Sequence, residues 1–125
     1  MAERILVVED DPTVRRILER ALALAGYEVV AAGSQREGEA LCAERLPEVI
    51  LADYTLPDGT GVDLAAHCRE RDPAVAVVLM SGYPLHHIGD ARLPEGTAFL
   101  PKPFLQGQLF RAIDSARGAA KRRTA

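Results

Sequence analysis

ILVVEDDP, at residues 5–12, is the stretch that decides the fold. Its four apolar residues form a continuous run, which is typical of a strand covered on both faces, and three acids follow directly. Three later apolar runs also end at or near polar side chains: residues 49–52 at Asp53, 75–80 at Ser81 and 97–100 close to Lys102. Because the carboxyl ends of neighbouring parallel strands face a common crevice, we expect these side chains to form one site.

Short β-branched runs alternate with longer amphipathic segments along the chain. Apolar side chains recur at helical spacing in residues 14–25, and Gly26 is expected to end that helix. Further strands are predicted at 29–31, 49–52, 75–80 and 97–100, and further helices after Ser34, at 62–71, and from Pro103 to near Gly118. Five strands alternating with helices predict a doubly wound α/β fold with a five-stranded parallel sheet.

Residues 82–96 interrupt this rhythm, because they contain three glycines and two prolines. These residue types oppose a continuous helix, so we expect a short or irregular fourth helix of at most a turn or two. His86 and His87 lie in this segment. Adjacent histidines in a loop are more often solvated than functional, and we assign them no role.

Composition excludes several classes of partner. The 125 residues suffice for one domain, and the net charge of -3 argues against direct binding to nucleic acid. No apolar run approaches the length of a membrane span, so we expect a cytoplasmic protein without a membrane partner. Cys42 and Cys68 lie in helical patterns without metal-binding spacing, which predicts reduced, buried thiols. The basic end, residues 119–125, is expected to be a tail or linker after a domain at 1–118.

Four segments together resemble the receiver domain of two-component signalling, in the CheY-like superfamily. They are ILVVEDDP at 5–12, ILADYTLPDGTG at 50–61, VLMSGY at 78–83 and FLPKPF at 99–104. Each motif alone is weak, but together, in this order and each at a predicted strand end, they are a strong signal. The resemblance covers nearly the whole chain, and we expect the flavodoxin-like strand order 2-1-3-4-5. A similar irregular fourth helix occurs in receivers joined to hybrid histidine kinases.

The resemblance implies that Asp53 accepts a phosphoryl group, as an acyl phosphate, from a histidine kinase or a histidine phosphotransfer protein. A carboxylate is a competent nucleophile, and the transfer needs mainly positioning and charge neutralisation. Ser81 would hydrogen-bond one phosphoryl oxygen, and Lys102 would pair with another. The chain would then be a phosphoacceptor switch rather than an enzyme, apart from slow self-dephosphorylation.

The resemblance also implies a magnesium site. Asp10 and Asp53 would bind Mg2+ directly, Glu9 would bind it through water, and Thr55 would offer its backbone carbonyl. Asp11 precedes a proline and is expected to cap the first helix instead of binding the metal. Without a cation the neighbouring carboxylates repel one another, which should raise at least one pKa.

Ser81 and Phe99 are the expected switch residues. Phosphorylation adds charge and acceptor oxygens, which would pull Ser81 and its loop inward. In the family an aromatic residue three positions before the lysine then turns inward; here it is Phe99, which lacks the hydroxyl of a tyrosine. A core residue of the fifth strand is the alternative for Phe99. The family usually has a cis peptide after the lysine, which Pro103 permits.

Other classes of protein fit less well. A haloacid-dehalogenase-type phosphatase needs an Asp-x-Asp arrangement after its first strand, and a nucleotide-binding Rossmann-like domain needs a glycine-rich turn there; neither is present. A degenerate receiver, acting only as a protein-interaction module, should lack a key residue. We expect a downstream protein effector or a covalently linked domain as partner, and a monomer or weak dimer. The sequence leaves open whether this is a stand-alone regulator or a receiver from a larger kinase or regulator.

Overall fold

The computed structural model describes residues 2–83 and 93–124 of the chain. Its main sheet has five parallel strands: β1 (Arg4–Val8), β2 (Glu28–Ala32), β3 (Val49–Asp53), β6 (Ala76–Ser81) and β7 (Ala98–Pro101). They lie in the order β2-β1-β3-β6-β7. Counted along the chain, this is the predicted flavodoxin-like order of five strands, so the predicted fold class is confirmed.

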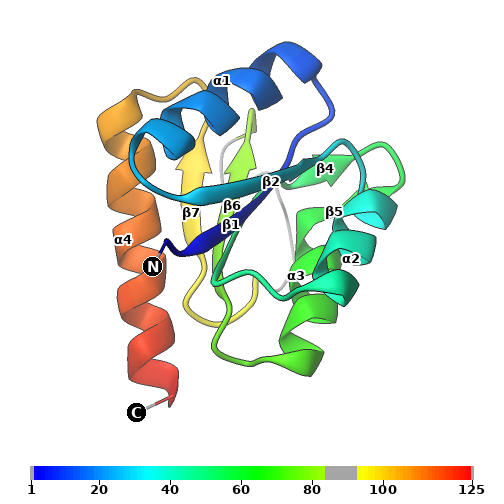
Figure 1. The fold of residues 1–125 in the computed structure, drawn as a ribbon, viewed down its shortest axis with the longest axis vertical. Coiled ribbons are helices and arrows are strands. Elements are labelled where there is room, and N and C mark those ends of the chain that lie inside the picture. Colours follow the sequence, from blue (N-terminus) through cyan, green and yellow to red (C-terminus); the bar gives the residue numbers. More distant parts are fainter. Residues whose placement is uncertain (1, 84–92, 125) are drawn as a thin grey trace.

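Four described helices cover the sheet: α1 (Pro12–Leu24), α2 (Gln35–Glu44), α3 (Gly61–Arg71) and α4 (Gln106–Thr124). Figure 1 shows α4 along one side of the sheet, with α2 and α3 together on the other. The buried side chains form two clusters, one for each face. One joins Leu22 of α1 and Ile113 of α4 to the sheet, and the other joins Leu64 of α3 to it.

β1 shows why the strand sequences are continuously apolar. Successive side chains of a strand point to opposite faces. Ile5 and Val7 accordingly belong to the cluster under α1 and α4, whereas Leu6 and Val8 belong to the cluster under α2 and α3. All four are fully buried. A strand with two covered faces is held rigidly, which fixes the position of the residues at its carboxyl end.

Three helix ends follow the predicted local signals. Asp11 caps α1, because its side chain accepts the backbone N–H of Thr13 at 2.8 Å, and Ser34 caps α2 by accepting the N–H of Glu37 at 3.1 Å. Gly26 follows α1 with φ of 100°, a conformation that side-chain-bearing residues rarely adopt. These three predictions are confirmed.

Three features differ from the sequence-based expectations or lie outside them. The turn-rich segment after β3 forms a small antiparallel hairpin of β4 (Thr55–Leu56) and β5 (Gly59–Thr60). The prediction of a last helix from Pro103 to near Gly118 is wrong at both ends, since α4 runs from Gln106 to Thr124. Its final turns are held by buried Ala120 and by the guanidinium of Arg123, which donates to backbone carbonyls near the start of β6. The irregular fourth helix, with His86 and His87, falls mainly on residues 84–92, outside the described residues.

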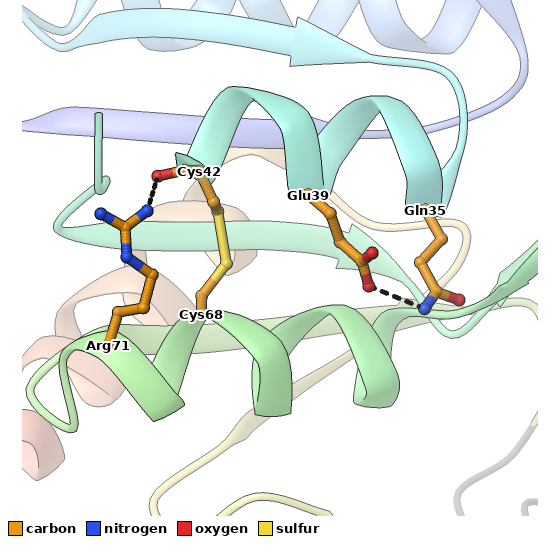
Figure 2. Close-up of a disulfide and its surroundings, with 5 residues drawn as sticks. All are labelled: Gln35, Glu39, Cys42, Cys68 and Arg71. Carbon is orange, nitrogen blue, oxygen red and sulfur yellow. Dashed lines mark hydrogen bonds between the residues drawn. A yellow bond between two sulfur atoms is a disulfide. The ribbon is translucent and has the colours of Figure 1, made fainter. Parts of the chain in front are cut away.

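The prediction of reduced thiols is also wrong for this structure. Cys42 of α2 and Cys68 of α3 form a disulfide, with their Cα atoms 6.4 Å apart (Figure 2). That spacing is within the usual range for a disulfide. The two residues belong to different helices, and only the packing of α2 beside α3 brings them together.

In the described ranges, no helix is both long enough and apolar enough to cross a membrane.

Reduction of the disulfide is expected to lower the stability of the protein. The bond closes a loop between residues separated by 26 positions. Such a loop restricts the unfolded chain and contributes about 3 kcal/mol. Urea unfolding of oxidised and dithiothreitol-treated protein measures the difference, and a Cys42→Ala/Cys68→Ala double variant, which should not respond to dithiothreitol, is the control. Equal unfolding midpoints for the oxidised and reduced wild type would contradict the expectation.

Candidate functional site

The predicted site residues converge at the carboxyl edge of the sheet. The ammonium Nζ of Lys102, just after β7, lies 2.8 Å from Oε1 of Glu9, just after β1. The same Nζ lies 2.8 Å from Oδ1 and 3.0 Å from Oδ2 of Asp53, at the end of β3. Residues separated by 93 and 49 positions in the sequence are thereby joined through one ammonium group.

Three acids form a compact cluster beside this lysine. Carboxylate oxygens of Glu9, Asp10 and Asp53 all lie within 4.8 Å of one another. Glu9 and Asp53 are buried, whereas Asp10 is exposed at the mouth of the site. Oε1 of Glu9 accepts from Lys102, but its Oε2 is buried without a hydrogen-bond partner. A buried acceptor without a donor is unusual and indicates that a ligand or water belongs there.

The donor set of this cluster fits a hard cation. Mg2+ prefers oxygen ligands, usually takes only one or two carboxylates from the protein and keeps several waters. The three acids offer only oxygen atoms, and the exposed carboxylate of Asp10 leaves an open side toward solvent. The acidic cluster is therefore suited to a partly hydrated divalent ion.

The electrostatics of Asp53 reflect its burial. Loss of hydration raises the pKa of its carboxyl group, and the hydrogen bond and positive charge of Lys102 act in the opposite direction. The expectation of a raised pKa in the acidic cluster is confirmed in direction, but its largest cause is burial and not repulsion between acids. Lys102 only partly compensates this carboxylate, so a further cation near Asp53 would be favourable.

Ser81 lies at the end of β6, next to β3, and is buried. Its hydroxyl accepts the backbone N–H of Tyr83 at 3.0 Å, and its backbone carbonyl accepts the N–H of Lys102 at 2.8 Å. The hydroxyl therefore organises the turn after β6 in this state. The backbone bond fixes Ser81 beside the residue whose ammonium contacts Asp53.

The structure places the other predicted residues as follows. Thr55 is exposed two positions after Asp53 and pairs with Thr60 in the β4–β5 hairpin. Phe99 lies on β7 opposite Leu79 of β6 and is half-buried rather than fully buried. The cis peptide bond expected after Lys102 is confirmed. The proposed switch roles of Ser81 and Phe99 stay predictions.

Arg15 is a contact of the site that the sequence did not reveal. Its guanidinium donates to the backbone carbonyl of Glu9 at 2.8 Å, and it packs against Gly33. This bond ties the acidic loop, residues 9–11 after β1, to the first turns of α1. In the sequence, Arg15 is one of several basic residues on the polar face of that helix, and no pattern distinguishes it from its neighbours.

An acidic cluster with a bridging lysine, at the carboxyl edge of a flavodoxin-like sheet, defines a protein of the phosphoacceptor receiver class. Residues 5–114 match the family described as the response regulator receiver domain. The chain belongs to this family. Receiver domains of this family act in phosphorylation-based two-component signalling, as phosphoacceptor switches rather than conventional enzymes, and they interact with histidine kinases.

Curated relatives support the family assignment, and the share of each relative that this chain covers differs widely. The response regulator receiver protein CpdR of Brucella abortus is 32% identical over 117 residues, which cover 90% of this chain and 94% of CpdR. The DNA-binding transcriptional regulator NtrC of Salmonella typhimurium is 33% identical over 101 residues, or 80% of this chain. The match spans only 22% of NtrC, and only 26% of the regulator PilR of Pseudomonas aeruginosa. Some relatives bind DNA, so the expectation that this chain does not bind nucleic acid stays a prediction.

Solved structures agree on the fold. The crystal structure of a response regulator receiver protein from Sinorhizobium medicae matches with a TM-score of 0.86 at 25% identity, covering 95% of this chain and 97% of that one. A CheY-like receiver domain from Methanospirillum hungatei matches with a TM-score of 0.84 at 24% identity, covering 98% of this chain and 99% of that one. The second match supports the fold alone.

Asp53→Asn is expected to stabilise the protein in Mg2+-free buffer at neutral pH, by about 1 kcal/mol. The pKa of Asp53 is higher in the folded state than its ordinary value. Between the ordinary aspartate pKa and the raised pKa of folded Asp53, ionisation is harder in the folded state than in the unfolded state. The free energy of unfolding therefore falls as the pH rises through this range. Below that window the carboxyl group is protonated in both states, so the advantage of the variant should disappear in acid.

Urea unfolding at several pH values measures this difference. Asp63→Asn, which removes an exposed acid from the first turn of α3, is the matched control and should not be stabilised. An Asp53→Asn protein that is less stable than wild type at neutral pH would show that the buried charge is fully compensated, contrary to the account of the site.

Proposed function

We propose that Asp53 is the phosphoacceptor of this receiver domain and that the phosphoryl group comes from a phosphohistidine of a kinase or phosphotransfer protein. The main support is the position of the Lys102 ammonium, within 3.0 Å of both carboxylate oxygens of Asp53 and bonded to buried Glu9. A site of this kind holds a cation where negative charge accumulates during phosphoryl transfer.

In the proposed reaction an oxygen of Asp53 attacks the phosphorus atom. The phosphorus–nitrogen bond to the donor histidine breaks, the imidazole keeps the electron pair and takes up a proton, and an acyl phosphate forms on the protein. Lys102 would move from the carboxylate to a phosphoryl oxygen. Its flexible side chain is partly exposed, so its ammonium group can shift toward the new negative charge. Ser81 would donate its hydroxyl to another phosphoryl oxygen after releasing the N–H of Tyr83.

The acidic cluster would hold Mg2+ in this proposal. Asp10 and Asp53 would bind it directly, Thr55 would bind through its backbone carbonyl, and Glu9 would bind through water. Lys102 occupies one oxygen of Glu9, and the second oxygen has no partner, which suits an indirect role through a water molecule. When bound, Mg2+ would supply positive charge against the acids and the transferred group.

The signal to a partner would follow from the negative charge that phosphorylation adds at Asp53. The phosphoryl group would draw in Ser81 with its loop, and Phe99 on the neighbouring strand would change its exposure. This would alter the surface offered to an effector protein or a linked domain. A monomer or weak dimer in the cytoplasm, with slow self-dephosphorylation and no direct contact with nucleic acid, completes the proposal. A degenerate receiver that only binds partners is less favoured, because every residue of the predicted site is present and the acids and lysine lie together.

Reaction with a small phosphodonor tests the proposal. Wild-type protein incubated with acetyl phosphate and Mg2+ should gain a single phosphoryl group, measured by intact mass, that hydroxylamine removes. Asp53→Asn should gain none, and chelation of Mg2+ should prevent the reaction. Lys102→Met should lower the rate on the order of 100-fold, because it removes a charge that stabilises the transition state.

Asp63→Asn, which removes an exposed acid from the first turn of α3, is the control for the loss of one negative charge. It should react like wild type. Transfer from a histidine phosphotransfer protein tests the physiological donor class. Modification that persists in Asp53→Asn would disprove the assignment of the acceptor, and binding of a partner without any modification would favour the interaction-module alternative.

A further inference from the structure

Two loops carry the residues proposed to hold the metal, and the junction between β2 and α2 contacts both. On one side, the carbonyl of Ala32, at the end of β2, accepts the N–H of Glu9 in the acidic loop at 3.0 Å. On the other side, the carboxylate of Asp58 in the β4–β5 turn accepts the N–H groups of Gln35 and Arg36 at 2.8 and 2.9 Å. The segment that runs from Ala32, at the end of β2, to Arg36, in the first turn of α2, therefore contacts both the acidic loop and the loop after Asp53 and forms a bridge between them.

The side chain of Gln35 strengthens this bridge. Its Oε1 accepts the N–H of Thr60 at 3.1 Å, and its Nε2 donates to Glu39 one turn further along α2 at 3.0 Å (Figure 2). Thr60 is the hairpin partner of Thr55. A Cβ atom at Gly59 would lie 1.7 Å from Oε1 of Gln35, so the amide rests directly on the hairpin backbone and would have to move for any larger residue there.

The bridge is anchored on a rigid element. The disulfide joins α2 to α3, and the guanidinium of Arg71 donates to the carbonyl of Cys42 at 3.0 Å (Figure 2). The N-terminus of a helix also attracts anions, which favours a carboxylate at the position of Asp58. The N–H groups of Arg36 and Gln35 lower the pKa of Asp58, so its ionised form is the one that makes these bonds.

From these contacts we infer that Gln35 and Asp58 are positioning residues, which set the place of the Thr55 carbonyl relative to the acids after β1 and thereby the affinity of the site for a divalent cation. This inference rests on the proposed function of the acidic cluster. Mg2+ demands nearly ideal octahedral geometry, so a small displacement of one ligand lowers its affinity. Removal of groups that orient ligands typically costs about 10- to 100-fold in metal affinity.

Gln35→Ala and Asp58→Ala test the inference in the full chain. Gln35→Ala leaves the net charge unchanged, so an effect on Mg2+ binding cannot come from the loss of a charged group. Mg2+ binding is measured by titration calorimetry, and the Mg2+ dependence of reaction with acetyl phosphate is measured in parallel. Both variants should weaken Mg2+ binding by about tenfold, and the reaction rate at saturating Mg2+ should return to within about twofold of wild type.

Glu44→Gln is the matched control, since it removes an exposed charge from the last turn of the same helix. It should leave both measurements unchanged. Asp58→Asn keeps an oxygen that can accept one N–H group and should lie between wild type and Asp58→Ala. Folding of each variant is checked by circular dichroism, and Asp58→Asn serves in place of a variant that fails to fold.

The outcomes separate this inference from the proposed function. A lower melting temperature with unchanged Mg2+ affinity in Gln35→Ala and Asp58→Ala would overturn the inference, because the bridge would then be only structural. Absence of phosphorylation on Asp53 in wild type would overturn the proposed function, whereas the calorimetric comparison would still decide whether the bridge controls cation binding.

Discussion

One ammonium group compensates two buried carboxylates in this structure. Nζ of Lys102 lies 2.8 Å from an oxygen of Glu9 and 2.8 Å from an oxygen of Asp53, and both acids are almost inaccessible to solvent. Buried charges are costly unless they are paired, so this contact makes the acidic edge of the sheet compatible with a folded protein. The compensation is partial, since the pKa of Asp53 stays raised and one oxygen of Glu9 has no partner.

The rest of the fold holds these three residues in place. β1 and β3 are neighbours in the middle of the sheet and are buried on both faces, so Glu9 and Asp53 leave rigid strand ends in adjacent positions. Lys102 follows β7 at the sheet edge, and its backbone bond to Ser81 brings its long side chain across β6. The two helical layers thus serve the site indirectly, by fixing the strand ends.

Local sequence signals were sufficient for the strands, for the first residues of α1 and α2, and for the residues that meet at the site. Continuous apolar runs predicted the strands, the residues at their ends predicted the members of the site, and Asp11 before a proline predicted a helix cap. The disulfide was missed, because Cys42 and Cys68 meet only through the packing of two helices. The end of α4 was misplaced, because Gly118 and the basic residues after it resemble a helix end, whereas contacts with distant backbone carbonyls keep them helical. The contacts of Gln35 could not be predicted from local signals either, because their partners, Asp58 and Thr60, lie in a separate loop.

A crystal structure of the protein with Mg2+ and beryllofluoride, which mimics a phosphoryl group, tests the central claim most directly. The account predicts beryllofluoride on the carboxylate of Asp53, the cation among the three acids, and Lys102 shifted from Asp53 to a fluoride atom. A structure in which beryllofluoride binds elsewhere, or in which Lys102 keeps both carboxylates while the acids hold no cation, would contradict it.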